Sequence, residues 1–216
     1  MKQVKAIVLF AFFIFSSQFA KAQTTSKTFK LNDFDKVQIE NVNGQIEIEL
    51  GKPFSITITY KEAADEQINV SKVADKLILQ LDEKYVRDWK KIKPVVIKIS
   101  MPEISKLSNI SNADVSINKF VGRYLGIDNN GNGNVMIVGT VVDFIEITNN
   151  GNGNIETKTI NAKRVIISKS GNGDVSVTTD NDFKIEMAGN GDIVNYGKGK
   201  AIIDKQSGTG KVVYRN

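Results

Sequence analysis

A fixed spacing of apolar residues is the feature of this sequence that most limits how the chain can fold. From about residue 105 two apolar series each recur every ten residues, the second displaced by two positions from the first. Alternating apolar pairs at this spacing predict short strands with one buried face, each followed by a turn. The first series is Val115, Leu125, Val135, Ile145, Ile155, Val165, Val175 and Ile185, and the second is Leu107, Ile117, Ile127, Ile137, Ile147, Thr157, Ile167, Val177 and Met187.

The turns alternate in kind, which doubles the repeat to about twenty residues. Gly-Asn-Gly occupies 131–133, 151–153, 171–173 and 189–191, and Gly-Thr-Gly follows at 208–210, whereas the intervening corners differ in sequence. In a parallel coil each Gly-Asn-Gly corner lies directly above the previous one, about 4.8 Å away, where Asn side chains can form a hydrogen-bonded ladder. An antiparallel meander also turns every ten residues but gives no reason to repeat one corner.

The repeat therefore predicts an all-β, parallel β-helix-like solenoid. Each rung is expected to hold about twenty residues, two strands and one Gly-Asn-Gly corner, with the second corners at 138–142, 161–163 and 180–182. We expect the corner glycines to be required for positive φ. Thr157 is the polar break in its column, and its hydroxyl is expected to bond to a nearby carbonyl.

The N-terminus predicts export. Lys2 and Lys5 precede an apolar run at 6–15, and Ala20-Lys21-Ala22 has the small-x-small order of a cleavage site, so residues 1–22 are expected to be a signal peptide. The apolar run is shorter than the roughly twenty residues of a membrane span, so no integral span is expected after cleavage. Residues 23–216 are expected to form a single all-β domain, with less regular strands over 23–104 and the regular solenoid over 105–216. The expected location is the periplasm, the outer cell surface or the extracellular space.

Composition excludes several classes of function. The chain has no His and no Cys, which removes zinc sites, Ser-His and Cys-His nucleophilic catalysis, and disulfides. Three of the 29 Lys and Arg residues lie in the signal, which leaves 26 against 24 Asp and Glu. A nearly neutral mature chain predicts no nucleic-acid partner, since that function requires a clustered basic face. No cofactor and no metal site are expected.

Four stretches occur in the order of a known family: "FDKVQIENVNGQIEIELG" at 34–51, "ADKLILQLDE" at 74–83, "KPVVIKISMPEISKLSNISNADVSI" at 93–117, and the glycine-asparagine repeats up to Gly210. The chain resembles the family labelled putative auto-transporter adhesin, head GIN domain, over nearly all of its mature length. The resemblance implies an exported envelope or surface domain of Gram-negative bacteria, built largely as a right-handed β-helix, with a proposed role in adhesion. It implies no catalytic residues.

Two features are candidate binding sites. The first is the Asn-rich edge that stacked corners would create, which offers amide donors and acceptors at regular spacing. The second is the segment 82–94, "DEKYVRDWKKIKP", where Tyr85 and Trp89 lie among basic residues. These aromatic rings suit a sugar or an anionic polymer, or they cap the end of the core while the lysines stay solvated. The candidate residues are Asn130, Asn132, Asn150, Asn152, Asn172, Asn190, Trp89 and Tyr85.

The sequence gives less support to three more specific functions: phosphate binding, calcium binding and glycoside hydrolysis. The corners are followed by strands, whereas phosphate loops precede helices. Calcium-binding β-rolls repeat every nine residues with an Asp in each copy, whereas here the period is about twenty. Of the equivalent positions Asn134, Asn154, Asp174 and Asp192 only the last two are charged, which leaves at most an incidental cation near them. A glycosidase needs two carboxylates roughly 5 to 9.5 Å apart, and Glu146 and Glu156 are the acids in similar registers.

The sequence therefore favours an exported noncatalytic binding or adhesion domain with a polysaccharide or surface-protein partner. A periplasmic structural protein without a ligand and, behind it, a carbohydrate-active β-helix enzyme are the alternatives. The sequence sets no oligomeric state.

Overall fold

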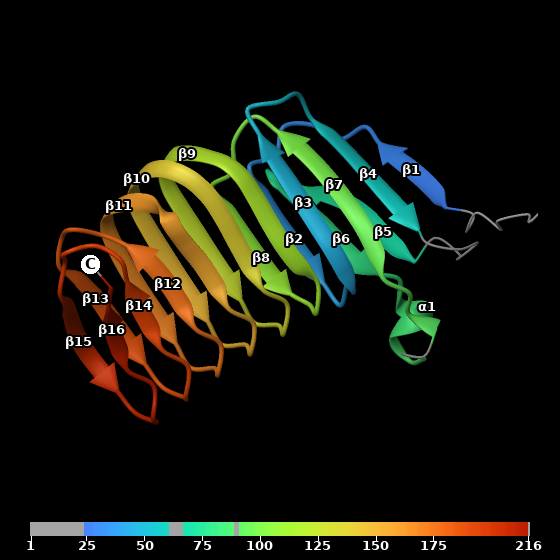
Figure 1. The fold of residues 1–216 in the computed structure, drawn as a ribbon. Helices are drawn as coiled ribbons and strands as arrows, with labels where there is room; N and C mark the ends of the chain where they lie inside the picture. The colour runs from blue at the N-terminus through green and yellow to red at the C-terminus, as the bar shows by residue number, and fades with distance from the viewer. Residues whose placement is uncertain (1–23, 61–66, 89–90, 216) are drawn as a thin grey trace, which may run out of the picture.

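The fold is a flattened coil of β-strands, seen in a computed structural model that describes residues 24–60, 67–88 and 91–215 (Figure 1). The predicted signal peptide and Trp89 lie outside the described residues. The all-β class is confirmed: a large, mostly parallel sheet wraps into two faces, consistent with a β-helix-like fold. The elements are β1 (Thr25–Phe29), β2 (Lys36–Glu40), β3 (Gly44–Leu50), β4 (Ser55–Tyr60), β5 (Ile68–Val73), β6 (Lys76–Leu81), α1 (Glu83–Val86), β7 (Val95–Met101), β8 (Lys106–Ile110), β9 (Asp114–Asn129), β10 (Val135–Asn149), β11 (Ile155–Lys169), β12 (Val175–Thr178), β13 (Phe183–Met187), β14 (Ile193–Asn195), β15 (Ala201–Gln206) and β16 (Val212–Tyr214).

The strands form two facing layers, and within each layer they follow one another along the long axis of the molecule (Figure 1). The first face has the order β1-β4-β7-β3-β9-β10-β11-β12-β14-β16. The second face has the order β5-β6-β2-β8, then the C-terminal halves of β9, β10 and β11, then β13 and β15. Pairing is antiparallel where β1 meets β4, β4 meets β7 and β5 meets β6, and parallel between all the other strand pairs of the described chain.

The register of the middle strands follows the repeat. Val135 pairs with Val115 on one side and with Ile155 on the other, and Ile145 pairs with Leu125 and Val165. Side chains of both apolar series are therefore stacked in columns, and every member of the two series is at most 2% exposed. The Thr157 hydroxyl donates to the carbonyl of Ser176 at 3.1 Å, as the sequence predicts.

The division of each rung into two strands differs from the expectation in the middle of the coil. β9, β10 and β11 each run through both faces as one bent strand of 15 or 16 residues, so the predicted corners at 138–142 and 161–163 lie inside strands. The register between β9 and β10 shifts around Gly139, but hydrogen bonding resumes on the second face. The bend between β10 and β11 stays paired at Val141 and Val142. The tight corners are also linked from rung to rung, since the N–H of Asn152 donates to the carbonyl of Gly131 at 3.2 Å.

The stacked glycines are needed for close approach, which corrects the expectation of positive φ. Gly189 and Gly208 do have φ near +88° and +86°, but Gly131, Gly151 and Gly171 are not in the left-handed region. A Cβ built on Gly151 would lie 1.8 Å from the carbonyl oxygen of Gly131 in the preceding rung. Corners stacked at the strand spacing therefore leave no volume for a side chain at this position.

Candidate functional site

An exposed ladder of amides runs along the edge formed by the tight corners. Asn132 donates through Nδ2 to Oδ1 of Asn112 at 2.8 Å, and Asn152 donates to Asn132 at the same distance. The series continues from Asn172 and Asn190 at 2.8 and 2.9 Å and ends with the Thr209 hydroxyl, which donates to Asn190. The predicted asparagine ladder is thus present, and every side-chain bond points toward the N-terminal end.

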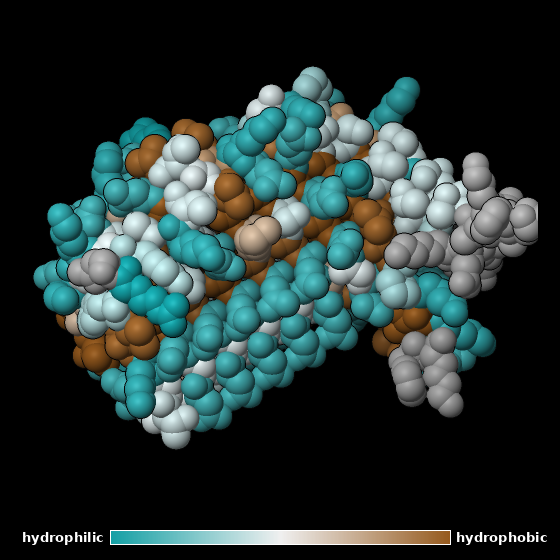
Figure 2. Space-filling model, in the orientation of Figure 1, coloured by the Kyte–Doolittle hydropathy of each residue, from teal (hydrophilic) through white to brown (hydrophobic). Residues whose placement is uncertain are grey.

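Two further rows run beside this ladder. Asn150 donates to Asn130 at 3.0 Å, and the Ser170 hydroxyl donates to Asn150 at 2.6 Å. Figure 2 shows the hydrophilic residues of this edge stacked in rows along the axis. The third row serves the backbone, because each side-chain oxygen accepts the N–H of the equivalent residue one rung on, through Asp114, Asn134, Asn154, Asp174 and Asp192.

The third row bears on the calcium hypothesis. Asp174 Oδ1 accepts the backbone N–H of Asp192 at 2.7 Å, and Asp192 Oδ1 accepts that of Lys211 at 2.9 Å. These carboxylates therefore cap the turns. Within the described residues, no group of three or more acidic side chains is arranged to hold a metal ion.

A buried asparagine column lies directly inside the exposed one, and the sequence interpretation missed it. Asn109, Asn129 and Asn149 are 0% exposed, and each donates to a carbonyl four residues on, at Ala113, Gly133 and Gly153 respectively. These bonds satisfy corner carbonyls that would otherwise be buried without a donor. The signal was available, because Asn129 and Asn149 continue the inward alternation of their strands by one more step.

Each amide in the exposed ladder keeps capacity for a ligand. A primary amide has two N–H donors and an oxygen with two lone pairs, and the ladder uses one donor and one lone pair of each inner member. One N–H and one lone pair thus remain on Asn132, Asn152 and Asn172. The edge therefore offers a repeated donor and acceptor at the rung spacing of about 4.8 Å.

The N-terminal end of this edge opens into a pocket of about 360 Å³. Asn130 and Asn132 line it together with Val86 and Ile92, so the structure joins the Asn-rich edge to the segment 82–94. Tyr85 is only 7% exposed and packs into the core, with the Lys84 ammonium 4.8 Å from its ring centroid. The core-capping interpretation of Tyr85 thus describes its position, while Trp89 lies outside the described part of the chain.

Comparison with protein families decides what the chain is related to. Residues 33–199 match the family described as putative auto-transporter adhesin, head GIN domain. The chain belongs to this family. The match covers most of the sequence and includes both the irregular strands and the repeated corners of this head GIN domain.

Solved structures show the same fold. A putative adhesin from Bacteroides fragilis NCTC 9343 is similar with a TM-score of 0.65 at 20% identity, over 90% of this chain and 98% of that one. A putative adhesin from Parabacteroides distasonis ATCC 8503 is similar with a TM-score of 0.50 at 15% identity, over 89% of this chain and 97% of that one. No curated protein matches the sequence.

The acids of this head GIN domain are engaged separately. Glu156 lies on the first face, where it is ion-paired with Lys158, whereas Glu146 lies on the second face, where it accepts a hydrogen bond from the Tyr124 hydroxyl at 2.9 Å. Burial and this bond raise the pKa of Tyr124 to about 12. The two carboxylates project from opposite faces, so they do not form the pair that a glycosidase requires.

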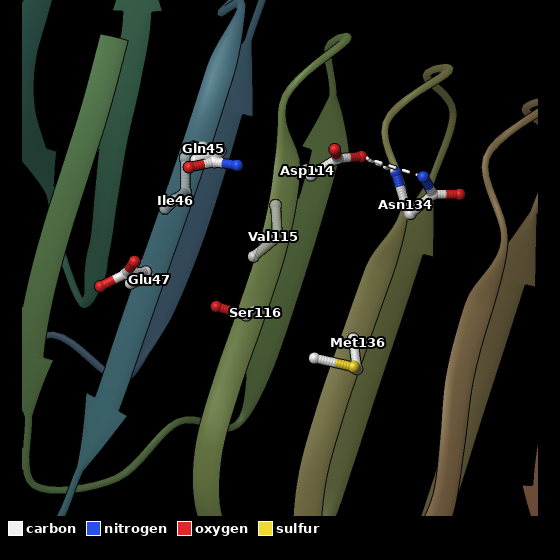
Figure 3. A pocket seen from close by; sticks show the side chains of 8 residues that line it. All are labelled: Gln45, Ile46, Glu47, Asp114, Val115, Ser116, Asn134 and Met136. Carbon is white, nitrogen blue, oxygen red and sulfur yellow. Dashed lines mark hydrogen bonds between the residues drawn. The ribbon is translucent and has the colours of Figure 1, made fainter.

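A second, smaller groove of about 220 Å³ lies on the first face between β3, β9 and β10 (Figure 3). Asp114 accepts from the backbone and side-chain nitrogens of Asn134 there, at 2.8 and 3.0 Å. Glu47 is ion-paired with Lys98 at 3.2 Å. Both acids in the groove thus have partners. Within the described residues, no helix is both long enough and apolar enough to cross a membrane.

Proposed function

We propose that this chain is an exported, noncatalytic binding domain of the bacterial cell envelope, with adhesion as its role. The Asn-rich edge would be the binding surface, and its ligand an extended, repetitive glycan or surface protein. The observation that supports this proposal is the exposed amide ladder, which repeats the same unused donor and acceptor on successive rungs. We also propose that the coil is right-handed, with rungs of about twenty residues that end in Gly-Asn-Gly.

Rigid spacing is what makes such an edge suited to a polymer. The amides are held by bonds to their neighbours, so little side-chain entropy remains to be lost on binding. Several weak contacts to one polymer act together through effective concentration, which raises the affinity well above that of a single contact. The family membership and the structural similarity to putative adhesins agree with this role.

The test replaces Asn132, Asn152 and Asn172 together by Ser. A serine hydroxyl can reach an asparagine one rung away, as Ser170 reaches Asn150, but two stacked serines are too short to bond to each other. The triple variant therefore loses the continuous ladder and its spare amide groups, so we expect binding to envelope polysaccharide or to whole cells to weaken by about tenfold or more. Glycan arrays and adhesion assays measure the change, and circular dichroism shows that the fold is retained. The matched control is Asn118→Ser with Asn161→Ser, which changes exposed asparagines away from the tight corners.

The main alternative is a periplasmic structural protein in which the ladder only stabilises the coil. On that hypothesis the triple variant loses melting temperature but binds every glycan and cell surface as the wild type does. Protease accessibility on intact cells adds a second criterion, since confinement to the periplasm contradicts a role in adhesion.

A further inference from the structure

The pocket at the N-terminal end of the ladder has a chemistry different from that of the rest of the edge. Its polar lining consists of the amides of Asn41, Asn112, Asn130 and Asn132 and the hydroxyl of Ser111, and all of its described lining residues are uncharged. Its apolar lining includes Val86 and Ile110, which are 51% and 42% exposed. In Figure 2 apolar surface lies beside α1 at this end of the hydrophilic rows.

Because all amides in the ladders donate in the same direction, the N-terminal end of the edge presents unused N–H groups. Each amide donates to the rung before it, so Asn112 and Asn130 accept from Asn132 and Asn150, and the Nδ2 groups of both have no partner among the residues that the structure describes. The column that holds Asn130 continues with Ile110, because Asn109 pairs with Asn129, and an isoleucine side chain has no acceptor to offer. Chains of aligned hydrogen bonds polarise one another, which strengthens the unpaired donors at the end.

The lining selects the kind of acceptor that fits. A carboxylate would lose hydration on entering and would find no cation among the described lining residues, so a charged ligand is disfavoured. An amide carbonyl accepts the same N–H groups without that cost, and a methyl group next to it would cover Val86 and Ile110. The acetamido group joins a carbonyl to a methyl group, and 360 Å³ is within the range of about 300 to 1,000 Å³ typical of small-ligand pockets.

We infer that this pocket binds an acetamido sugar at the end of a glycan whose following units lie along the Asn-rich edge. The inference rests on the proposed function and specifies its ligand. Asn112 and Asn130 would donate to the acetamido carbonyl, and Val86 and Ile110 would pack against its methyl group. The edge would then bind repeating units, while the pocket would set which unit begins the bound stretch.

The ligand test compares two disaccharides that differ only at the relevant group. N,N′-Diacetylchitobiose and cellobiose share the same linkage and ring configuration, but only the first carries acetamido groups. We expect titration calorimetry or NMR titration of the full chain to show diacetylchitobiose binding at least about tenfold more tightly, the discrimination expected when donors that the bound sugar covers lose their acceptor. Equal affinity for the two disaccharides, or no binding of diacetylchitobiose, would overturn the inference.

The protein test uses Ile110→Asp, which places a charge in the pocket at an exposed strand position. Diacetylchitobiose binding is expected to fall about tenfold or more, whereas Ile202→Asp, at a position 48% exposed on β15, leaves it unchanged. Asn130→Ser provides a second variant that retains the fold if Ile110→Asp does not. Unchanged binding in both pocket variants refutes the assignment. If the triple edge variant still weakens polysaccharide binding in that case, the proposed function stands and only the pocket assignment fails.

Discussion

Gly151 shows how strongly a single residue is constrained by the rung that precedes it. Its Cβ would meet the Gly131 carbonyl oxygen at 1.8 Å, whereas the adjacent Asn152 is exposed to solvent. We expect Gly151→Ala to cost about 3 kcal/mol or more, since the rungs must separate. Asn152→Ala is expected to cost about 1 kcal/mol. Chemical denaturation of both variants measures the contrast, and equal losses would contradict the stacking explanation.

Lys169 occupies the rung position that follows the buried column of Asn109, Asn129 and Asn149. It is only 2% exposed, and its ammonium donates to the carbonyl of Gly171 at 2.7 Å. Burial lowers the pKa of Lys169 from 10.5, and Asp174 and Asp192 partly oppose this shift. The charged form is therefore less stable in the folded state than in the unfolded chain.

Replacing Lys169 by Met, the residue at 187 in the next rung, is expected to raise stability at pH 7 by about 1 kcal/mol or more. For a chain of this size each kcal/mol shifts the melting temperature by about 2 to 4 °C. The unfolded state binds more protons between the lowered pKa of Lys169 and 10.5, so the wild type gains stability relative to Lys169→Met as the pH rises through this window. Thermal melts of both proteins across that pH window measure the difference in their stability. If the Lys169 side chain were solvated, this difference would not change with pH.

At the scale of the element, β10 and the corner that follows it form one transferable unit. Val115 pairs with Val135 in the same way that Val135 pairs with Ile155, so each rung interacts with equivalent neighbours. We expect deletion of 135–154 to leave a folded protein whose stability falls by the interface of one rung, on the order of a few kcal/mol. Deletion of 145–154 removes only half a rung, so each later strand would have to move to the opposite face of the coil, where its neighbours no longer match. In thermal unfolding, we expect a cooperative transition for the 135–154 deletion and no cooperative transition for the 145–154 deletion.

The whole molecule has two long edges of different chemistry. The tight corners carry the rows of amides, whereas the bends within β9 and β10 expose Val121, Val138 and Val141. The two ends also differ, because antiparallel strands pair at the N-terminal end, while β15 is exposed along most of its length. An extended polar ligand therefore has one matching edge, and the pocket beside α1 gives that edge a distinct starting point.

Much of this arrangement was determined by the sequence itself. The ten-residue apolar spacing predicted which side chains are inside, and the repeated Gly-Asn-Gly predicted the ladder from Asn132 to Asn190. These predictions succeeded because the parallel pairing of β9, β10 and β11 places residues twenty apart side by side, so in this part of the chain the pattern recurs from strand to strand and needs no long-range information.

The tertiary structure alone decided the rest. The pairing of β2 with both β6 and β8 joins Val37 to Leu77 and Leu107, at separations that follow no repeat. The opposite faces of Glu146 and Glu156, the steric need for Gly151 and the pocket beside α1 depend on where separate segments meet in space. Such contacts depend on packing between distant parts of the chain, and a local pattern of residues carries no record of them.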